Sequence, residues 1–149
     1  MARRERARSP GGGRDRPYYR GPVPPFRLLA VISLGGAIGA LGRWGIAQAM
    51  PHAGTAFPWA TLITNVLGCL LMGVLMGVTP PDPLLRPFLG TGVLGGFTTF
   101  STFAIETRTL LAGHAWLQAW LYVAGSVVLG LTAVRLGPAV VHRSRGAAG

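Results

Sequence analysis

Apolar residues dominate four long stretches of the chain. Charged residues are absent from 28–42, 44–81, 87–105 and 109–134. A membrane helix needs about 20 predominantly apolar residues, so the second stretch is too long for one helix. The turn-forming run from Pro51 to Thr55 divides it. The pattern therefore predicts an all-α membrane protein with four transmembrane helices, near 27–50, 59–78, 85–111 and 115–137.

The spans lack a polar face, and composition agrees with a membrane location. Charged residues make up 12% of the 149 residues, against about 25% in a soluble domain. Helices that are apolar all round are buried or lie in lipid, so a soluble enzyme is excluded. The single cysteine, Cys69, excludes a disulfide scaffold. The length fits one domain, which we place at 27–137.

Positive charge gathers at the N-terminus, while the net charge of the chain is +10. Residues 1–26 are Arg-rich and have no apolar periodicity, so we expect a disordered tail. We expect it to contact anionic membrane lipid and not nucleic acid, which is recognised by a basic face on a folded domain. Four spans place both termini on one side, which the positive-inside rule makes cytoplasmic. Residues 138–149 form a second tail.

The third span is predicted to break near its middle. Gly92, Gly95 and Gly96 weaken a helix, and four hydroxyl residues within 98–102 can bond the backbone in its place. A broken membrane helix is tolerated where it is buried in protein or lines a cavity. Carbonyls freed at such a break are oxygen ligands for a small cation such as Na⁺. The alternative is a kinked helix packed through its glycines.

Two pairs of polar residues lie at membrane depth, where polar groups are costly and usually functional. Thr61 and Asn65 are four residues apart in the second span, and Tyr122 and Ser126 are four apart in the fourth. This spacing puts each pair on one helix face. Each pair is either a set of hydrogen bonds between helices or a row of donors along an ion pathway.

Aromatic and charged residues complete the candidate set. Phe100 and Phe103 share a face and are either core residues or rings whose positive edges face an anion. Arg43 and Glu106 lie on the same side of the membrane, and they either pair or reach the interface separately. His52 lies in a connection and is expected to be solvated.

Three segments resemble the bacterial fluoride channels called Fluc or CrcB. They are GGAIGALGRW at 35–44, PWATLITNVLG at 58–68 and GGFTTFSTFAIE at 95–106. The resemblance covers all four spans in the same order. It implies a passive fluoride-selective channel in the bacterial plasma membrane, which exports fluoride and lowers its cytoplasmic concentration. It also implies that four-helix subunits pair as an antiparallel dimer.

The resemblance further implies roles for individual residues. The fluoride pathway would be lined by Asn65, Thr61, Phe100, Phe103, Tyr122 and Ser126. Backbone carbonyls of Gly95 and Thr98 would hold a structural Na⁺ shared between subunits. Arg43 and Glu106 match charged positions outside the constriction. Gly130 stands where the fourth helix of the family often has a hydroxyl, and Thr132 is nearby.

Two other functional classes remain as alternatives. A small four-helix proton-coupled exporter needs a carboxylate within the membrane, and Glu106 is the only acidic residue in any predicted span. A structural subunit without transport is the third class. An antiparallel homodimer requires the chain to insert in both orientations, whereas the Arg-rich tail favours one. The dimer is therefore either a homodimer formed despite this bias or a heterodimer with an oppositely oriented paralogue.

Overall fold

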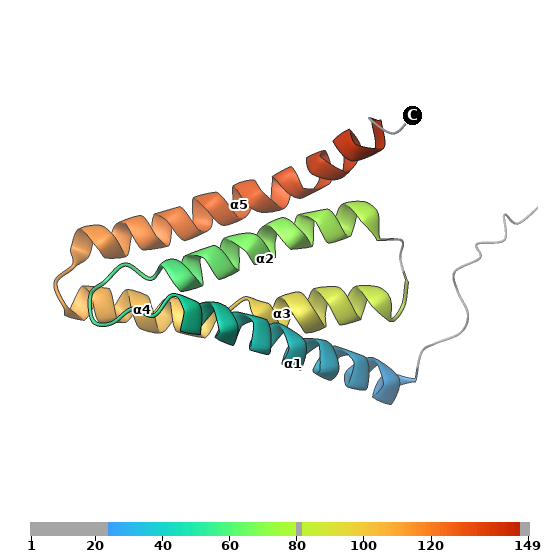
Figure 1. The fold of residues 1–149 in the computed structure, drawn as a ribbon, viewed down its shortest axis with the longest axis horizontal. Coiled ribbons are helices and arrows are strands. Elements are labelled where there is room, and N and C mark those ends of the chain that lie inside the picture. The colour runs from blue at the N-terminus through green and yellow to red at the C-terminus, as the bar shows by residue number, and fades with distance from the viewer. Residues whose placement is uncertain (1–23, 80–81, 147–149) are drawn as a thin grey trace, which may run out of the picture.

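The computed structural model describes residues 24–79 and 82–146, which form an elongated bundle of helices (Figure 1). Most of the predicted N-terminal tail and the end of the C-terminal tail lie outside these residues. The elements are α1 (Pro25–Ala49), α2 (Trp59–Val78), η1 (Pro87–Leu94), α3 (Gly95–Phe97), α4 (Phe100–Ala112) and α5 (Trp116–Gly146). The elements η1, α3 and α4 together form the third span.

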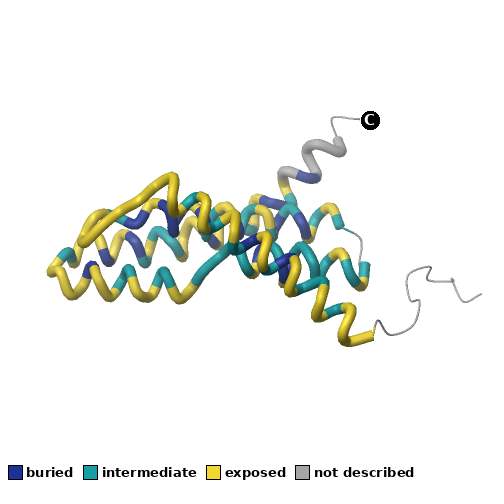
Figure 2. Tube along the Cα trace, turned by 60° about the horizontal axis from the view of Figure 1, so that its bottom comes forward, coloured by how far each residue is buried: buried dark blue, intermediate teal, exposed yellow. Residues whose placement is uncertain are grey.

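Within residues 24–79 and 82–146, four helical segments are long and apolar enough to cross a membrane. The predictions of four spans and of a bent third span are therefore confirmed. Large apolar side chains such as Leu29, Leu41, Trp120 and Leu131 are exposed in the single chain. Figure 2 shows exposed residues along every helix. Such a surface suits lipid or another apolar partner and not water.

Close packing between helices depends on glycines. The helix α1 lies against η1 and α3, and α2 lies against α5. At Gly39 of α1, an added Cβ would come within 2.7 Å of Phe97 N. At Gly92 of η1, it would come within 3.0 Å of Gly35 Cα. Small residues let the backbones approach closely, which drives packing where lipid offers no hydrophobic force.

The break in the third span falls at Thr98 and Thr99. Both have extended backbones, with ψ of 160° at Thr98 and 127° at Thr99. Thr99 Oγ1 accepts a hydrogen bond of 3.2 Å from Thr102 N and so caps α4. Gly95 and Gly96 remain helical, and Gly96 lies against the backbone of α1. The glycines thus serve packing, and the threonines make the break.

The fourth candidate span, Trp116–Ala139, lies close to the predicted 115–137, but the helix that contains it extends further. The helix α5 ends at Gly146 instead of residue 137, and Pro138 lies within it. Proline removes one backbone donor and bends a helix, but it need not end one. Val141, past the proline, is buried and faces Gly77 of α2. This packing accounts for the continuation of the helix.

Candidate functional site

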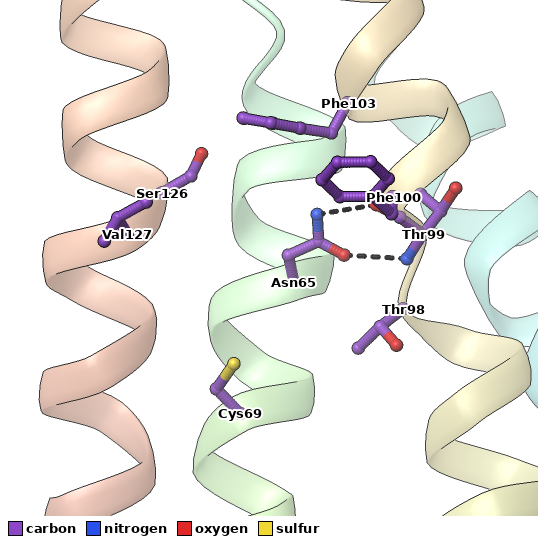
Figure 3. A pocket seen from close by; sticks show the side chains of 8 residues that line it. All are labelled: Asn65, Cys69, Thr98, Thr99, Phe100, Phe103, Ser126 and Val127. Carbon is purple, nitrogen blue, oxygen red and sulfur yellow. Dashed lines mark hydrogen bonds between the residues drawn. The ribbon is translucent and has the colours of Figure 1, made fainter.

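Asn65 joins α2 to the break in the third span. Its Nδ2 donates to Thr99 O at 3.0 Å, and Thr99 N donates to its Oδ1 at 2.8 Å (Figure 3). A side-chain amide offers both a donor and an acceptor. It can therefore replace both hydrogen bonds that a continuous helix would give to the N–H and C=O groups of Thr99. The interhelical hydrogen bond expected of Asn65 is therefore present, and it holds the break in place.

A cavity of about 330 Å³ lies beside this amide. It is lined by Asn65, Cys69, Thr98, Thr99, Phe100, Phe103, Ser126 and Val127. In Figure 3, Asn65 and Cys69 follow one another along α2, opposite Ser126 and Val127 of α5. No lining residue is charged. The structure thus brings four of the predicted pathway residues to one uncharged cavity.

The two phenylalanines differ in environment. Their ring centroids are 5.8 Å apart. Phe103 packs on the buried core and lies 5.1 Å from the Tyr122 ring. Phe100 is 80% exposed in the single chain. Packing in the core therefore accounts for the position of Phe103. It does not account for the exposed ring of Phe100.

Thr61 and Tyr122 meet at Glu106, apart from the Asn65 cavity. Thr61 Oγ1 donates to Glu106 Oε1 at 2.8 Å, and Tyr122 Oη donates to Oε2 at 2.6 Å. His52 Nε2 lies 3.3 Å from Oε1, and His52 is exposed to solvent as expected. The loop after α1 folds back to place the imidazole there. Phe103 links this cluster to the cavity through its contact with the Tyr122 ring.

Arg43 and Glu106 have separate partners. Arg43 Nε donates to Gly96 O at 3.3 Å. Its side chain lines another cavity, of about 300 Å³, with Thr61 and Thr99. Of the two arrangements left open by the sequence, the structure shows the one without an ion pair between them.

The break diverts the donors that a continuous helix would give to Gly95 and Thr98. In an α-helix, the carbonyl of each residue accepts from the N–H four residues on. Thr99 N instead donates to Asn65, and Thr102 N lies 3.2 Å from Thr99 Oγ1. The carbonyls of Gly95 and Thr98 therefore lose their helical donors. Hard oxygen ligands of this kind suit a small cation, whereas the described residues contain no cluster of three His, Cys, Asp or Glu side chains.

A second cavity, of about 480 Å³, continues from the first toward the η1 end. It is lined by Gly68, Cys69, Met72, Leu94, Gly95, Thr98, Ser126, Val127, Gly130, Leu131 and Val134. Ser126 Oγ is buried and has no hydrogen-bond partner among the described residues. Thr132 Oγ1 donates to Val128 O at 2.8 Å on an exposed face, so it does not replace a hydroxyl at Gly130.

Two residues of the site were missed by sequence reasoning. Thr99 was treated as one of several hydroxyls, although it is both the partner of Asn65 and the cap of α4. Cys69 was considered only for disulfides, yet it lines both cavities. Its position four residues after Asn65, on the same helix face, was the available signal.

Four apolar spans, a broken third helix and an uncharged cavity at the break define a small multi-pass membrane protein. Residues 30–138 match the family model described as CrcB-like protein, Camphor Resistance (CrcB). The chain belongs to this CrcB family. It is 48% identical over 131 residues to "Fluoride-specific ion channel FluC 2" of Nocardia farcinica, covering 85% of this chain and 93% of the relative. It is 49% identical over 115 residues to "Fluoride-specific ion channel FluC" of Chloroflexus aurantiacus, covering 73% and 90%.

Proposed function

We propose that this chain is a fluoride-selective passive channel of the bacterial plasma membrane, which exports fluoride and lowers its cytoplasmic concentration. The names of its relatives support this function. The observation that carries it is the uncharged cavity at Asn65, where donors from three helical segments face one space. Hydrogen fluoride crosses the membrane as a neutral acid and dissociates inside, and the trapped anion then leaves through the channel.

The chemistry of the cavity suits a small, strongly hydrated anion. Conduction requires binding that replaces the hydration shell and still lets the ion leave. Asn65 Nδ2 carries two hydrogens, and the bond to Thr99 O uses one of them. Ser126 Oγ adds a donor without a partner among the described residues. The ring edges of Phe100 and Phe103 carry partial positive charge, so the anion meets no fixed cation that would hold it.

Thr61 and Tyr122 belong to the end of the pathway near Glu106. Their hydroxyls donate to the Glu106 carboxylate. To bind fluoride, each hydroxyl would turn away from this carboxylate and toward the anion. Glu106 itself lines a small cavity beside His52 and not the cavity at Asn65. A proton-coupled exporter would need its carboxylate in the substrate cavity, so this placement favours the channel.

Structural Na⁺ and a second subunit are parts of the same proposal. The carbonyls of Gly95 and Thr98 would hold the ion, because the break has removed their helical donors. Bound there, Na⁺ would supply a positive field near the anion pathway. Two carbonyls from one chain are fewer ligands than a cation takes, which supports an antiparallel dimer. The 80% exposure of Phe100 also supports a partner that covers it, either an identical chain or an oppositely oriented paralogue.

Fluoride efflux from liposomes tests the proposal. The full-length protein should release fluoride without a proton gradient and retain chloride. Phe100→Ile should reduce the efflux at least tenfold, because it removes a ring edge from the cavity. Phe26→Ile is the matched control, since Phe26 is 67% exposed in α1 and does not line the cavity.

Two results would contradict the channel, and a third would contradict the role of Phe100 in it. Efflux that requires a proton gradient would indicate an exporter. No efflux from a protein that elutes as a folded species would indicate a structural subunit. Equal efflux from the Phe100→Ile and Phe26→Ile variants would remove the ring pair from the pathway.

A further inference from the structure

The two cavities beside the break share the same central residues. Cys69, Thr98, Ser126 and Val127 line both of them. The cavities therefore form one continuous groove between α2, α5 and the break in the third span. The groove runs from Phe103 at one end to Val134 at the other. Cys69, on α2, lies where the two cavities join.

The part of the groove beyond Ser126 offers few donors. Apart from Cys69, Thr98 and Ser126, its lining is composed of glycines and apolar side chains. Thr98 lines it too, but Thr98 Oγ1 donates to Leu94 O at 2.9 Å. Ser126 Oγ is buried and has no partner among the described residues. The Cys69 thiol is half-buried and forms no disulfide, and a thiol is a weak donor. These two groups are the side-chain donors that the described protein leaves for an ion in this part of the groove.

Gly130 gives the thiol its room. A Cβ added at Gly130 would lie 3.4 Å from Cys69 Sγ, so the two positions face each other across the groove. Ser126 lies one helical turn before Gly130 on α5. The thiol therefore stands one turn further along the groove than the Ser126 hydroxyl, on the opposite wall.

We propose that the Cys69 thiol is a donor subsite for a small hydrated monovalent anion. It receives the anion from Ser126 and carries the pathway toward the η1 end of the groove. The thiol on α2 thus supplies a hydrogen-bond donor at the turn where α5 has Gly130, which carries no side-chain donor. This inference rests on the proposed function, with fluoride as the anion.

Efflux of fluoride from liposomes tests the subsite with a set of variants at positions 69 and 130. Cys69→Ala removes the donor and should slow efflux about tenfold or more, the size expected for a hydrogen bond to a charged group. Cys69→Ser keeps a donor and should be several-fold faster than Cys69→Ala. In Cys69→Ala/Gly130→Ser, a hydroxyl returns from the opposite wall and should restore part of the loss. Elution as a single species checks that each variant is folded.

Thiol modification gives an independent readout, because Cys69 is the only cysteine of the chain. A methanethiosulfonate reagent should block efflux through the wild-type protein and leave Cys69→Ser unaffected. Rescue by the double variant together with this block would support the subsite. Wild-type efflux that Cys69→Ala leaves unchanged, or a modified protein that still conducts, would overturn it while the proposed function stands. A wild-type protein that carries no fluoride would overturn both.

Discussion

The two halves of the bundle are held together by different parts of the chain. One half contains η1 and α3, the segments of α1 and α2 that pack on them and the segment of α5 that packs on α2, and we call it the glycine half. There, Gly35 meets Gly92 and Gly73 meets Gly137 through their backbones. The other half contains α4 and the segments that face it, and we call it the side-chain half. It is held by a core around Leu110 and by aromatic contacts and bonds to Glu106.

This difference separates the contacts that fix the positions of the helices from the contacts that hold the polar side chains around Glu106. Backbones in contact leave no room for side chains between them, so the glycine half fixes the positions of the helices. Larger side chains keep the helices apart in the other half, and this spacing admits the hydroxyls of Thr61 and Tyr122 and the carboxylate of Glu106. The break at Thr98 and Thr99 lies at the boundary and belongs to both halves. Perturbing each half should therefore have a different outcome.

The largest effect is expected in the glycine half. Gly39→Ala would place a methyl group against Val93 O and 2.7 Å from Phe97 N. Both atoms are backbone, so the helices must separate, and we expect a loss of about 3 kcal/mol or more. Thermal unfolding in detergent measures it. Gly45→Ala in the same helix is the control, because nothing lies within 4 Å of its added Cβ. Equal unfolding temperatures would contradict the description of this half.

The boundary should respond next. Asn65→Leu leaves both Thr99 N and Thr99 O without their partner. Each unsatisfied group costs about 1–3 kcal/mol, so we expect lower stability and at least tenfold slower fluoride efflux. Thr64→Val is the control, since the Thr64 hydroxyl donates within its own helix, to Ala60 O. The role of Asn65 would be refuted if both variants behaved alike.

A smaller effect is expected in the side-chain half. Tyr122→Phe removes the 2.6 Å bond to Glu106 and keeps the ring contacts with Phe57 and Phe103. A hydrogen bond to a charged group contributes about 1.5–3 kcal/mol. A double-mutant cycle with Glu106→Gln isolates this coupling. Additive changes in unfolding free energy would show that the two side chains act independently.

The smallest effect is expected outside both halves, in the connection between α2 and η1. Asp82 Oδ1 accepts from Leu84 N at 2.9 Å and from Leu85 N at 2.6 Å. These bonds lower the pKa of Asp82 below its usual range. A depressed pKa in the folded state gives stability that is present above the unfolded pKa and lost as pH falls through the folded one. At pH 6, the wild-type protein should therefore have a higher unfolding temperature than Asp82→Ala. This difference should disappear below about pH 4. A constant difference in unfolding temperature would contradict this assignment.

The span positions could be predicted because they depend on local hydropathy. The charge-free stretches placed α2 at the residues where it is found. The break was also predictable, since hydroxyl residues compete for backbone bonds. The sequence did not reveal that Gly95 and Gly96 stay helical, because their role depends on a neighbouring helix. For the same reason, the sequence predicts an end of the fourth helix at residue 137, although the helix and its contact with α2 continue past Pro138.

Site residues were predictable where their chemistry is unusual for a membrane and not where it is ordinary. An amide such as Asn65 is conspicuous among apolar neighbours, so it was selected at once. Its partner Thr99 was one of four similar hydroxyls, and only the folded chain distinguishes it. His52 lies outside the spans, and a loop conformation brings it to Glu106. Cys69 counts as apolar in any hydropathy pattern and so was overlooked.

The wide turns of η1 hold one residue more than α-helical turns would. Gly95 N bonds back to Gly90 O, five residues earlier, where an α-helix would bond back four. One residue fewer between Pro87 and Leu94 would close these turns to α-helical ones. Those turns would then carry the chain through nearly the same total angle with one residue fewer, so Thr99 would still face Asn65. The wide turns thus act as a reserve of one residue: a single-codon deletion within η1 would be absorbed there, whereas a deletion within α3, which is already α-helical, would set the break out of phase with the amide that holds it.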